Sequence, residues 1–241
     1  MTQDNTSHMA KIWLIIPAAG VGSRMQADRP KQYLPLNGRP IIEHTLERLA
    51  SALPQAEFVI CLNPDDPYWP EIQKPVGIRL QEVAGGKERA DSVLNGLKAI
   101  AGQASEDDWV LVHDVARPCV RKSDISALVD QLSDDPVGGI LALPVADTMK
   151  RAAQDNTISE TVDRTALWHA LTPQMFRFGK LTRALEQGLA AGAVITDEAS
   201  ALEWSGFSPR LVAGHRDNIK VTHPDDLAFA ALFLKSQAGD L

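Results

Sequence analysis

The chain has 241 residues, of which 44% are hydrophobic and 23% are charged. These fractions are those of an ordinary soluble globular protein, and they exclude a chain that is disordered over most of its length. The net charge of −7 argues against a nucleic-acid partner, which needs a basic surface. A phosphate-binding site needs only local positive charge, so such a site stays open. Two cysteines, Cys61 and Cys119, cannot form a disulfide framework, and we expect a cytoplasmic location.

The N-terminal segment resembles neither an export signal nor a membrane span. Residues 1–10 are polar and have no basic region ahead of an apolar one, so we expect a disordered tail. The apolar stretch Ile12–Ala19 is interrupted by Pro17 and is far shorter than the roughly 20 residues that cross a bilayer. We therefore expect no membrane partner.

Strands and helices alternate along the first part of the chain. The expected strands are Ile12–Pro17, Glu57–Leu62, Gly77–Val83, Trp109–His113 and Gly138–Val145. The expected helices are Ile41–Leu53, Glu88–Ala101 and one that Ser123 caps. This order predicts an α/β fold, a Rossmann-like and mostly parallel twisted sheet with helices on both faces. Ligands of such sheets bind beyond the carboxyl ends of the strands, so we expect the chemistry in the loops after Pro17, Val83, His113 and Val145.

One stretch interrupts the alternation. Thr148–Ala153 and Thr157–Arg164 are polar, β-compatible runs that a short turn joins, which predicts a hairpin. Its apolar surface is too small for independent stability, so it either lies on the domain or projects onto a partner. We favour a projecting arm, at about residues 147–165, that is exchanged in a homodimer.

The C-terminal part returns to helices and short strands. The expected elements are the helices Leu181–Ala190, Asp197–Trp204 and Asp225–Lys235 and the strands Arg210–Ala213 and Asn218–Val221. Asp225 and Asp226 would cap the last helix, where the helix dipole favours acidic residues. We expect a single domain over residues 11–236 that carries the hairpin arm, and a tail over residues 237–241.

The loop after the first strand is the main candidate for a ligand site. Small residues dominate residues 17–22, and such residues let a ligand approach the backbone, whose N–H groups can form an anion-binding nest. Between Lys11 and Lys31 the net charge is +3. Met25 stands where a dinucleotide fingerprint needs its third glycine, and the Gly-Lys-Ser/Thr ending of a P-loop is missing. An ordinary glycine bend is the alternative, which the basic residues after the glycines disfavour.

These residues carry a family resemblance. The string Pro17–Met25 followed by Pro30–Tyr33 resembles the signature of the nucleotidyltransferases. The full set of strings is similar to the 2-C-methyl-D-erythritol 4-phosphate cytidylyltransferases of the non-mevalonate isoprenoid pathway. The further strings are Gly85–Val93, Val112–Pro118, Asp147–Lys150, Thr161–Arg164, Leu171–Gln174, Ile195–Ala199 and Asn218–Thr222.

The resemblance implies transfer of CMP from CTP to 2-C-methyl-D-erythritol 4-phosphate with release of pyrophosphate. Two highly charged reactants must meet, so catalysis would consist of positioning and electrostatic stabilisation by cations. The resemblance implies that Arg24 and Lys31 hold the triphosphate and stabilise the transition state. It also implies that Lys220 is a catalytic lysine positioned at the α-phosphate.

The resemblance also implies a nucleotide site at the strand ends. Its expected residues are Pro17, Ala18, Ala19, Gly20, Gly22, Gly85, Gly86, Arg89, Ser92 and Asp114. Asp114 ends a strand, and a carboxylate there suits Mg²⁺, which takes one or two carboxylates and substrate phosphates. His113 alternates to the other side of the strand and is expected to be packed. We expect the backbone groups of Gly85 and Gly86 to read the base, with Ser92 in reach of the base or ribose. Lys87 stands where the family commonly has Asp, and we expect the backbone readout to survive this change.

For the acceptor, the resemblance implies that Thr148 and Arg164 bind its phosphate across the dimer, with Arg117, Thr172 and Thr196 on the acceptor side. A cytidylyltransferase for another polyol phosphate, such as ribitol 5-phosphate, is an alternative, and Thr148 and Arg164 favour the first assignment over it. A non-catalytic nucleotide-binding module is a second alternative. The chain has all four charged residues that are expected of the catalytic site, namely Arg24, Lys31, Asp114 and Lys220, and their presence disfavours a non-catalytic module.

Overall fold

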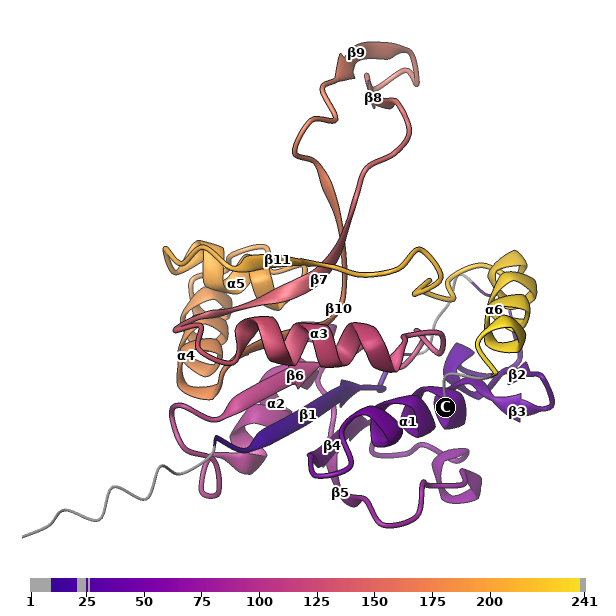
Figure 1. Ribbon diagram of the computed structural model, residues 1–241, viewed down its shortest axis with the longest axis vertical. Helices are drawn as coiled ribbons and strands as arrows, with labels where there is room; N and C mark the ends of the chain where they lie inside the picture. Colours follow the sequence, from indigo (N-terminus) through magenta and orange to yellow (C-terminus); the bar gives the residue numbers. More distant parts are fainter. Residues whose placement is uncertain (1–9, 21–24, 26, 239–241) are drawn as a thin grey trace, which may run out of the picture.

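The computed structural model describes residues 10–20, 25 and 27–238. Within these residues a seven-stranded sheet has the order β11-β7-β10-β6-β1-β4-β5 (Figure 1). Its strands are β1 (Ile12–Pro17), β4 (Glu57–Leu62), β5 (Arg79–Ala84), β6 (Trp109–Val112), β7 (Gly138–Pro144), β10 (Trp168–Arg177) and β11 (Arg210–Ala213). The helices are α1 (Ile41–Ala52), α2 (Arg89–Ile100), α3 (Lys122–Leu132), α4 (Phe178–Ala190), α5 (Glu198–Trp204) and α6 (Asp225–Ser236). The predicted α/β fold is confirmed.

The sheet is mostly parallel, and the order in which strands are added reverses at β1. From β1 the chain adds β4 and β5 in parallel on one side and then β6, also in parallel, on the other side. β10 is antiparallel to both of its neighbours, β6 and β7. The crevice beyond the carboxyl ends of β1 and β6 is thus a topological switch point, the usual ligand position in such sheets.

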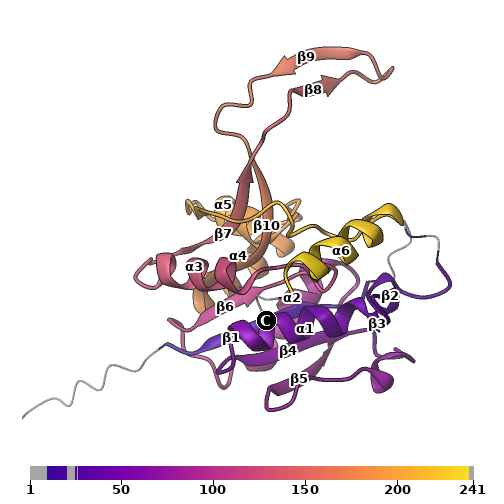
Figure 2. The same ribbon diagram turned by 45° about the vertical axis from the view of Figure 1, so that its right-hand side comes forward.

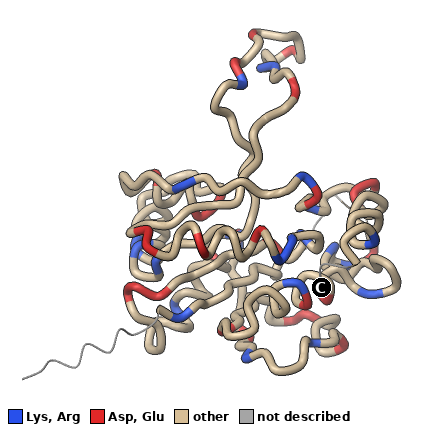
Figure 3. Tube along the Cα trace, viewed as in Figure 1, with Lys and Arg blue, Asp and Glu red and all other residues tan. Residues whose placement is uncertain are grey.

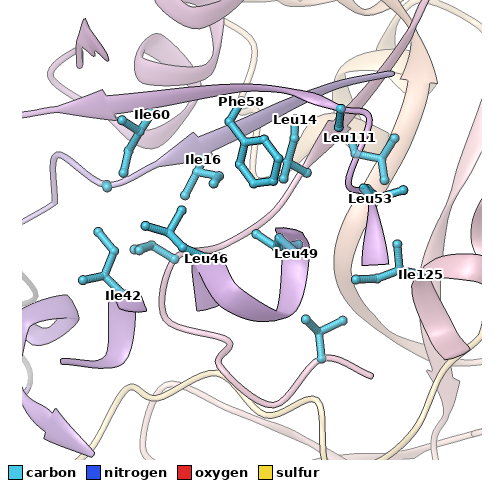
Figure 4. Packing of buried hydrophobic residues seen from close by; sticks show 14 of the residues in the cluster. Leu14, Ile16, Ile42, Leu46, Leu49, Leu53, Phe58, Ile60, Leu111 and Ile125 are labelled. Atoms are coloured by element: carbon cyan, nitrogen blue, oxygen red, sulfur yellow. The ribbon is translucent and has the colours of Figure 1, made fainter. Parts of the chain in front are cut away.

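Side-chain alternation along β1 divides the core into two layers. Leu14 and Ile16 point to the face that α1 and α3 cover, whereas Trp13 and Ile15 point to the face that α2, α4 and α5 cover. Figure 4 shows the first layer, in which residues of β1, β4 and β6 meet Leu46 and its neighbours on α1. A smaller cluster packs α6 against the start of α1. These layers hold the strand ends, and therefore the loops after them, in fixed places.

The predicted hairpin is present and projects from the sheet. β8 (Met149–Ala152) and β9 (Ile158–Val162) pair antiparallel in a separate two-stranded sheet. Two views show this arm extending away from the helices and the main sheet (Figures 1 and 2). The two chain segments of its stem continue β7 and β10, and the Val145 N–H donates to the Leu167 carbonyl where they leave the sheet. Ile158 on the arm is 65% exposed.

Two strand expectations in the C-terminal half are wrong. The sequence analysis missed β10, because Pro173 and the polar residues beside it interrupt the pattern of a strand. Residues 218–221 were expected to form a strand, but they run outside the sheet. There the Val221 N–H donates to the Ala116 carbonyl, which lies in a loop.

Two helix-end expectations also differ from the structure. Ser123 does not cap α3, since Arg121 occupies the cap position and Lys122 begins the helix. Residue 237 is not part of a tail. Gln237 is buried, and its side-chain amide donates to the Cys119 carbonyl and to Asp217. Asp226 stands in the first turn of α6 and accepts the Thr222 and His223 N–H groups that precede the helix.

Charged residues of both signs are spread over the trace and the arm (Figure 3). The positive field that a polyphosphate needs must therefore be sought in a local group of side chains. Among the described residues, no helix has the length and apolar character to pass through a bilayer.

Candidate active site

A cavity of about 330 Å³ lies at the switch point. Three of the four expected loops, those after β1, β5 and β6, line it, together with Lys31 and Lys220 from elsewhere in the chain. The fourth, after Val145, is not among the described lining residues and leads into the arm instead. Four basic and two acidic side chains are among its described lining residues, so the cavity is locally positive in a chain of net charge −7. The full lining is Pro17, Ala18, Ala19, Gly20, Lys31, Gln32, Gly86, Lys87, Glu88, Arg89, Ser92, Asp114, Val115, Ala116 and Lys220.

The loop after β1 forms one wall. The Ala18 N–H donates to the Cys61 carbonyl at 2.8 Å and so continues the pairing of β1 with β4. The buried Gln32 side chain donates to the Ala18 carbonyl at 2.8 Å. A Cβ at Gly20 would meet no atom of the described part of the chain within 4 Å, so these residues leave space there, next to the cavity. Gly22 and Arg24, expected in the same loop, lie outside the described residues.

The turn after β5 forms the opposite wall and requires glycine at two places. A Cβ on Gly85 would collide with the Ala19 side chain, and one on Gly86 would collide with Asp91. The Gly86 N–H donates to the Ser92 hydroxyl, which in turn contacts the Glu88 carbonyl at 3.2 Å. The Gly86 N–H and the Ser92 hydroxyl, which were expected to contact the base, therefore stabilise the conformation of the turn itself.

The two lysines predicted to be catalytic come together. Lys31 begins a short 3-10 helix, η2 (Lys31–Tyr33), and its Nζ donates to the Val221 carbonyl at 3.1 Å. Lys220, next to Val221, places its Nζ 2.9 Å from Asp114 Oδ2. The loop that was expected to be a strand thus delivers one lysine to the cavity and anchors the other.

Asp114 is the centre of a group of cations. Its Oδ1 lies 2.9 Å from Arg89 Nε, and its Oδ2 lies 2.9 Å from Lys220 Nζ and 3.4 Å from Arg117 Nε. Burial by itself would raise the pKa of the Asp114 carboxyl, but the charges of Arg89, Lys220 and Arg117 outweigh it and hold this pKa well below its ordinary value. Asp114 is therefore ionised at neutral pH.

The backbone of Asp114 is fixed by a buried chain of polar groups. Its N–H donates to Thr172 Oγ1 at 3.1 Å, and the same hydroxyl lies 3.1 Å from His113 Nδ1. The other ring nitrogen of His113 faces the Arg117 carbonyl at 3.2 Å. Burial lowers the pKa of His113 to about 4, so the ring is neutral and donates to this carbonyl while Thr172 donates to Nδ1. His113 is packed, as expected.

Arg89 lines the cavity, but its guanidinium is already engaged by two acidic side chains. Nη1 and Nη2 lie 2.7 and 3.0 Å from the two carboxylate oxygens of Glu198, and Nε binds Asp114. Direct contact of Arg89 with the nucleotide stays a prediction, which would require exchange of one of these ion pairs.

The residues expected to bind the acceptor are not gathered in one place. Thr148 and Arg164 are exposed on the arm, outside the cavity, and Thr196 is exposed just before α5. Thr172 is a correction, because it is buried outside the lining and its hydroxyl holds His113 and Asp114. Arg117 is also buried and binds the Asn218 carbonyl at 2.7 Å in addition to Asp114.

Sequence reasoning missed three residues that support the site: Gln32, Glu198 and Asn218. Gln32 and Asn218 stand inside quoted motifs that also contain a lysine. The side-chain amide of Gln32 donates to the Ala18 carbonyl in the loop after β1, and that of Asn218 donates to the Thr172 carbonyl in β10. Glu198 follows the capping residue Asp197 and looks in sequence like one more acid at a helix start. Burial is what distinguishes these residues, and a single sequence does not reveal it.

A pocket that gathers lysines around a loop of small residues is suited to hold a triphosphate, and on a sheet of this topology it defines a nucleotidyltransferase. Residues 12–236 match the family described as IspD: 2-C-methyl-D-erythritol 4-phosphate cytidylyltransferase. The chain is 57% identical over 220 residues to the enzyme of this description from Ectopseudomonas mendocina, which covers 91% of this chain and 94% of the relative. It is 54% identical over 239 residues to that of Vibrio parahaemolyticus, which covers 99% of this chain and 100% of the relative.

The solved structures agree. The crystal structure of the Francisella tularensis 2-C-methyl-D-erythritol 4-phosphate cytidylyltransferase is similar with a TM-score of 0.81 at 35% identity, and the match covers 93% of this chain and 100% of that one. The chain belongs to the 2-C-methyl-D-erythritol 4-phosphate cytidylyltransferase family. It transfers CMP from CTP to this acceptor in isoprenoid biosynthesis, which decides against another polyol phosphate and against a non-catalytic module.

Proposed function

We propose that Lys31 and Lys220 are the catalytic cations of the described pocket and that the acceptor is held by the arm of a second subunit. The observation that carries the first part is that both lysines line one cavity together with Asp114 and the loop of small residues. In this position their ammonium groups can stabilise negative charge that develops on a bound triphosphate. Arg24 joins them by resemblance alone.

The reaction is an in-line displacement at the α-phosphorus of CTP. A phosphate oxygen of the acceptor forms the new P–O bond, and the bond from the α-phosphorus to the bridging oxygen breaks, so its electron pair leaves with pyrophosphate. A phosphate monoester has a second pKa near 6 and is largely a dianion at neutral pH, so no side chain needs to remove a proton. The protein contributes orientation and charge, which fits a pocket built from lysines and backbone.

The donor set fits Mg²⁺ that arrives with the nucleotide. Among the described residues no group of three potential metal ligands exists, but Asp114 supplies one ionised carboxylate at the cavity. Mg²⁺ is commonly held by one or two carboxylates with phosphates and water as the other ligands. We propose that Asp114 is the protein ligand. A bound Mg²⁺ would neutralise phosphate charge, while Lys220 and Arg89 would share the Asp114 carboxylate with it.

The arm supports a homodimer. Thr148 and Arg164 lie on a hairpin that projects away from the main sheet and the helices (Figures 1 and 2), and neither residue lines the cavity of its own chain. The arm exposes Met149 and Ile158, and Trp168 at its base is 37% exposed, so it presents apolar surface that a second subunit can bury. A symmetric pair of such arms would place Thr148 and Arg164 at the partner's pocket. We also assign the enzyme to the cytoplasm, a reducing compartment that suits its two free cysteines.

Pyrophosphate release across a matrix of nucleoside triphosphates and polyol phosphates, with Mg²⁺, tests this proposal. We expect turnover with CTP and 2-C-methyl-D-erythritol 4-phosphate, and a loss of about a hundred-fold or more in Lys220→Ala. Lys235→Ala, which removes an exposed lysine on α6, is the matched control and should retain wild-type turnover. Wild-type turnover in Lys220→Ala would contradict the assigned role.

A further inference from the structure

Glu198 is a buried acid that lies behind the pocket without lining it. It is the first residue of α5, and its side chain is only 1% exposed. Both of its neighbours are fixed, since Asp197 caps the helix through the Ser200 N–H and the Ala199 N–H donates to Gln174 on β10. The carboxylate therefore has a defined position.

Glu198 determines how Arg89 can bind Asp114. Its two oxygens take both terminal nitrogens of the Arg89 guanidinium, at 2.7 and 3.0 Å. With the terminal nitrogens held by Glu198, it is Nε that binds Asp114, at Oδ1 and 2.9 Å. Oδ2 of Asp114 thereby stays available to Lys220, whose Nζ lies 2.9 Å away.

We propose that Glu198 is a positioning residue that sets the place of the Lys220 ammonium through Arg89 and Asp114. Arginine prefers two-point binding of a carboxylate. Without the Glu198 charge, the guanidinium would turn its terminal nitrogens onto both oxygens of Asp114 and displace Lys220 from Oδ2. The ammonium would then leave the position that faces the reacting phosphate. This inference rests on the proposed catalytic role of Lys220.

The first test compares Glu198→Gln with Glu43→Gln. Glu43 is the matched control, since it is also a helical, buried acid that binds an arginine, Arg39, and it lies outside the pocket. We expect kcat of Glu198→Gln to fall by about ten- to a hundred-fold, the range seen when a group that orients a functional residue is removed. The KM for the acceptor should change little, and Glu43→Gln should keep wild-type kcat. Equal losses in the two variants, in step with their thermal stability, would overturn the proposal.

The second test asks whether the effect passes through Lys220. In a Lys220→Ala background, Glu198→Gln should cause no further loss of kcat, because the group that it positions is gone. A loss that multiplies with that of Lys220→Ala would contradict the proposal. If Lys220→Ala itself keeps wild-type turnover, the role of Lys220 fails. If only Glu198→Gln does so, the positioning role alone fails.

A third variant keeps the proposal testable if Glu198→Gln folds poorly because it leaves Arg89 buried with one partner fewer. Removing both charges in Arg89→Gln/Glu198→Gln takes away this mismatch, so the fold should be recovered. Turnover should nevertheless stay at least ten-fold below wild type, because Asp114 has lost its anchor. Recovery of wild-type turnover together with stability would show that Glu198 serves only the fold.

Discussion

The pocket and the arm differ in how much of a binding site each of them forms within one chain. The pocket residues stand on strand ends that two buried layers hold in place, and their charged groups bind one another. The arm has no core, its strands are exposed, and Thr148 and Arg164 lie outside the pocket of their own chain. The pocket has a fixed geometry within one chain, which suits binding of the triphosphate. The arm alone forms no complete binding site, and we propose that a second subunit completes it. In the homodimer that we propose, one chain builds the nucleotide site and two chains build the acceptor site.

The largest effect is expected on the pocket side of this comparison. Lys31→Ala should lower kcat by about a hundred- to a thousand-fold, as when one preorganised donor to a developing charge is removed. The midpoint of thermal unfolding should change little, because the Lys31 side chain is partly exposed and packs on a loop. Steady-state kinetics and calorimetry on the same preparation test this. Loss of folding in parallel with activity would assign Lys31 to the structure instead.

A pH titration examines the buried groups behind the pocket. The folded pKa of His113 is about 4, below its ordinary value of 6.5, so between these values the unfolded chain binds a proton that the folded chain does not. Stability therefore rises with pH through this window, and about 3 kcal/mol should be lost on going from pH 7 to pH 4. The depressed pKa of Asp114 acts in a lower window, below its unfolded value of 3.8.

Chemical denaturation at several pH values measures this slope, and His113→Gln should reduce it. Burial also lowers the pKa of His44, so His44→Gln is the control that shows how much of the slope comes from elsewhere. An unchanged slope in His113→Gln would mean that His113 is not buried as a neutral ring.

On the arm, loss of one charge should affect only one substrate. Arg164→Ala should raise the KM for the acceptor by about ten- to a hundred-fold, since a hydrogen bond to a charged group contributes about 1.5–3 kcal/mol. CTP binding, followed by calorimetry, should stay near that of the wild type. Arg151→Ala is the matched control, because Arg151 is also on the arm and pairs with Glu160. Equal losses for both substrates would remove the distinction between the two regions.

The smallest expected effect concerns the apolar surface of the arm. Ile158→Asp should weaken dimerisation by roughly ten-fold, because it places a charge where apolar area would be buried. Sedimentation over a range of protein concentrations measures this. Val76→Asp, at a fully exposed position of the domain, is the control and should leave dimerisation unchanged. The same change in both variants would argue against a contact through the arm.

How far the sequence predicted this molecule depends on the kind of signal. β1, β4 and the arm were found because buried apolar runs and a polar turn are local patterns. β10 was missed, since Thr172, Pro173 and Gln174 hide a strand that is defined by its neighbours. The lysines of the site came from motifs, but Thr172 was assigned to the acceptor although it holds Asp114. Whether a residue binds a ligand or supports the fold depends on its burial and on its contacts with residues far away in the sequence. Local sequence patterns reveal neither of these.

The most direct test of the account mixes two impaired subunits, Lys31→Ala, which lowers kcat, and Arg164→Ala, which raises the KM for the acceptor. If the arm serves the partner's pocket, each mixed dimer has one site with both defects and one intact site with Lys31 from one chain and Arg164 from the other. Random mixing makes half of the dimers mixed, so about a quarter of wild-type activity should return at low acceptor concentration. Activity that stays at the level of the separate variants would contradict the shared acceptor site.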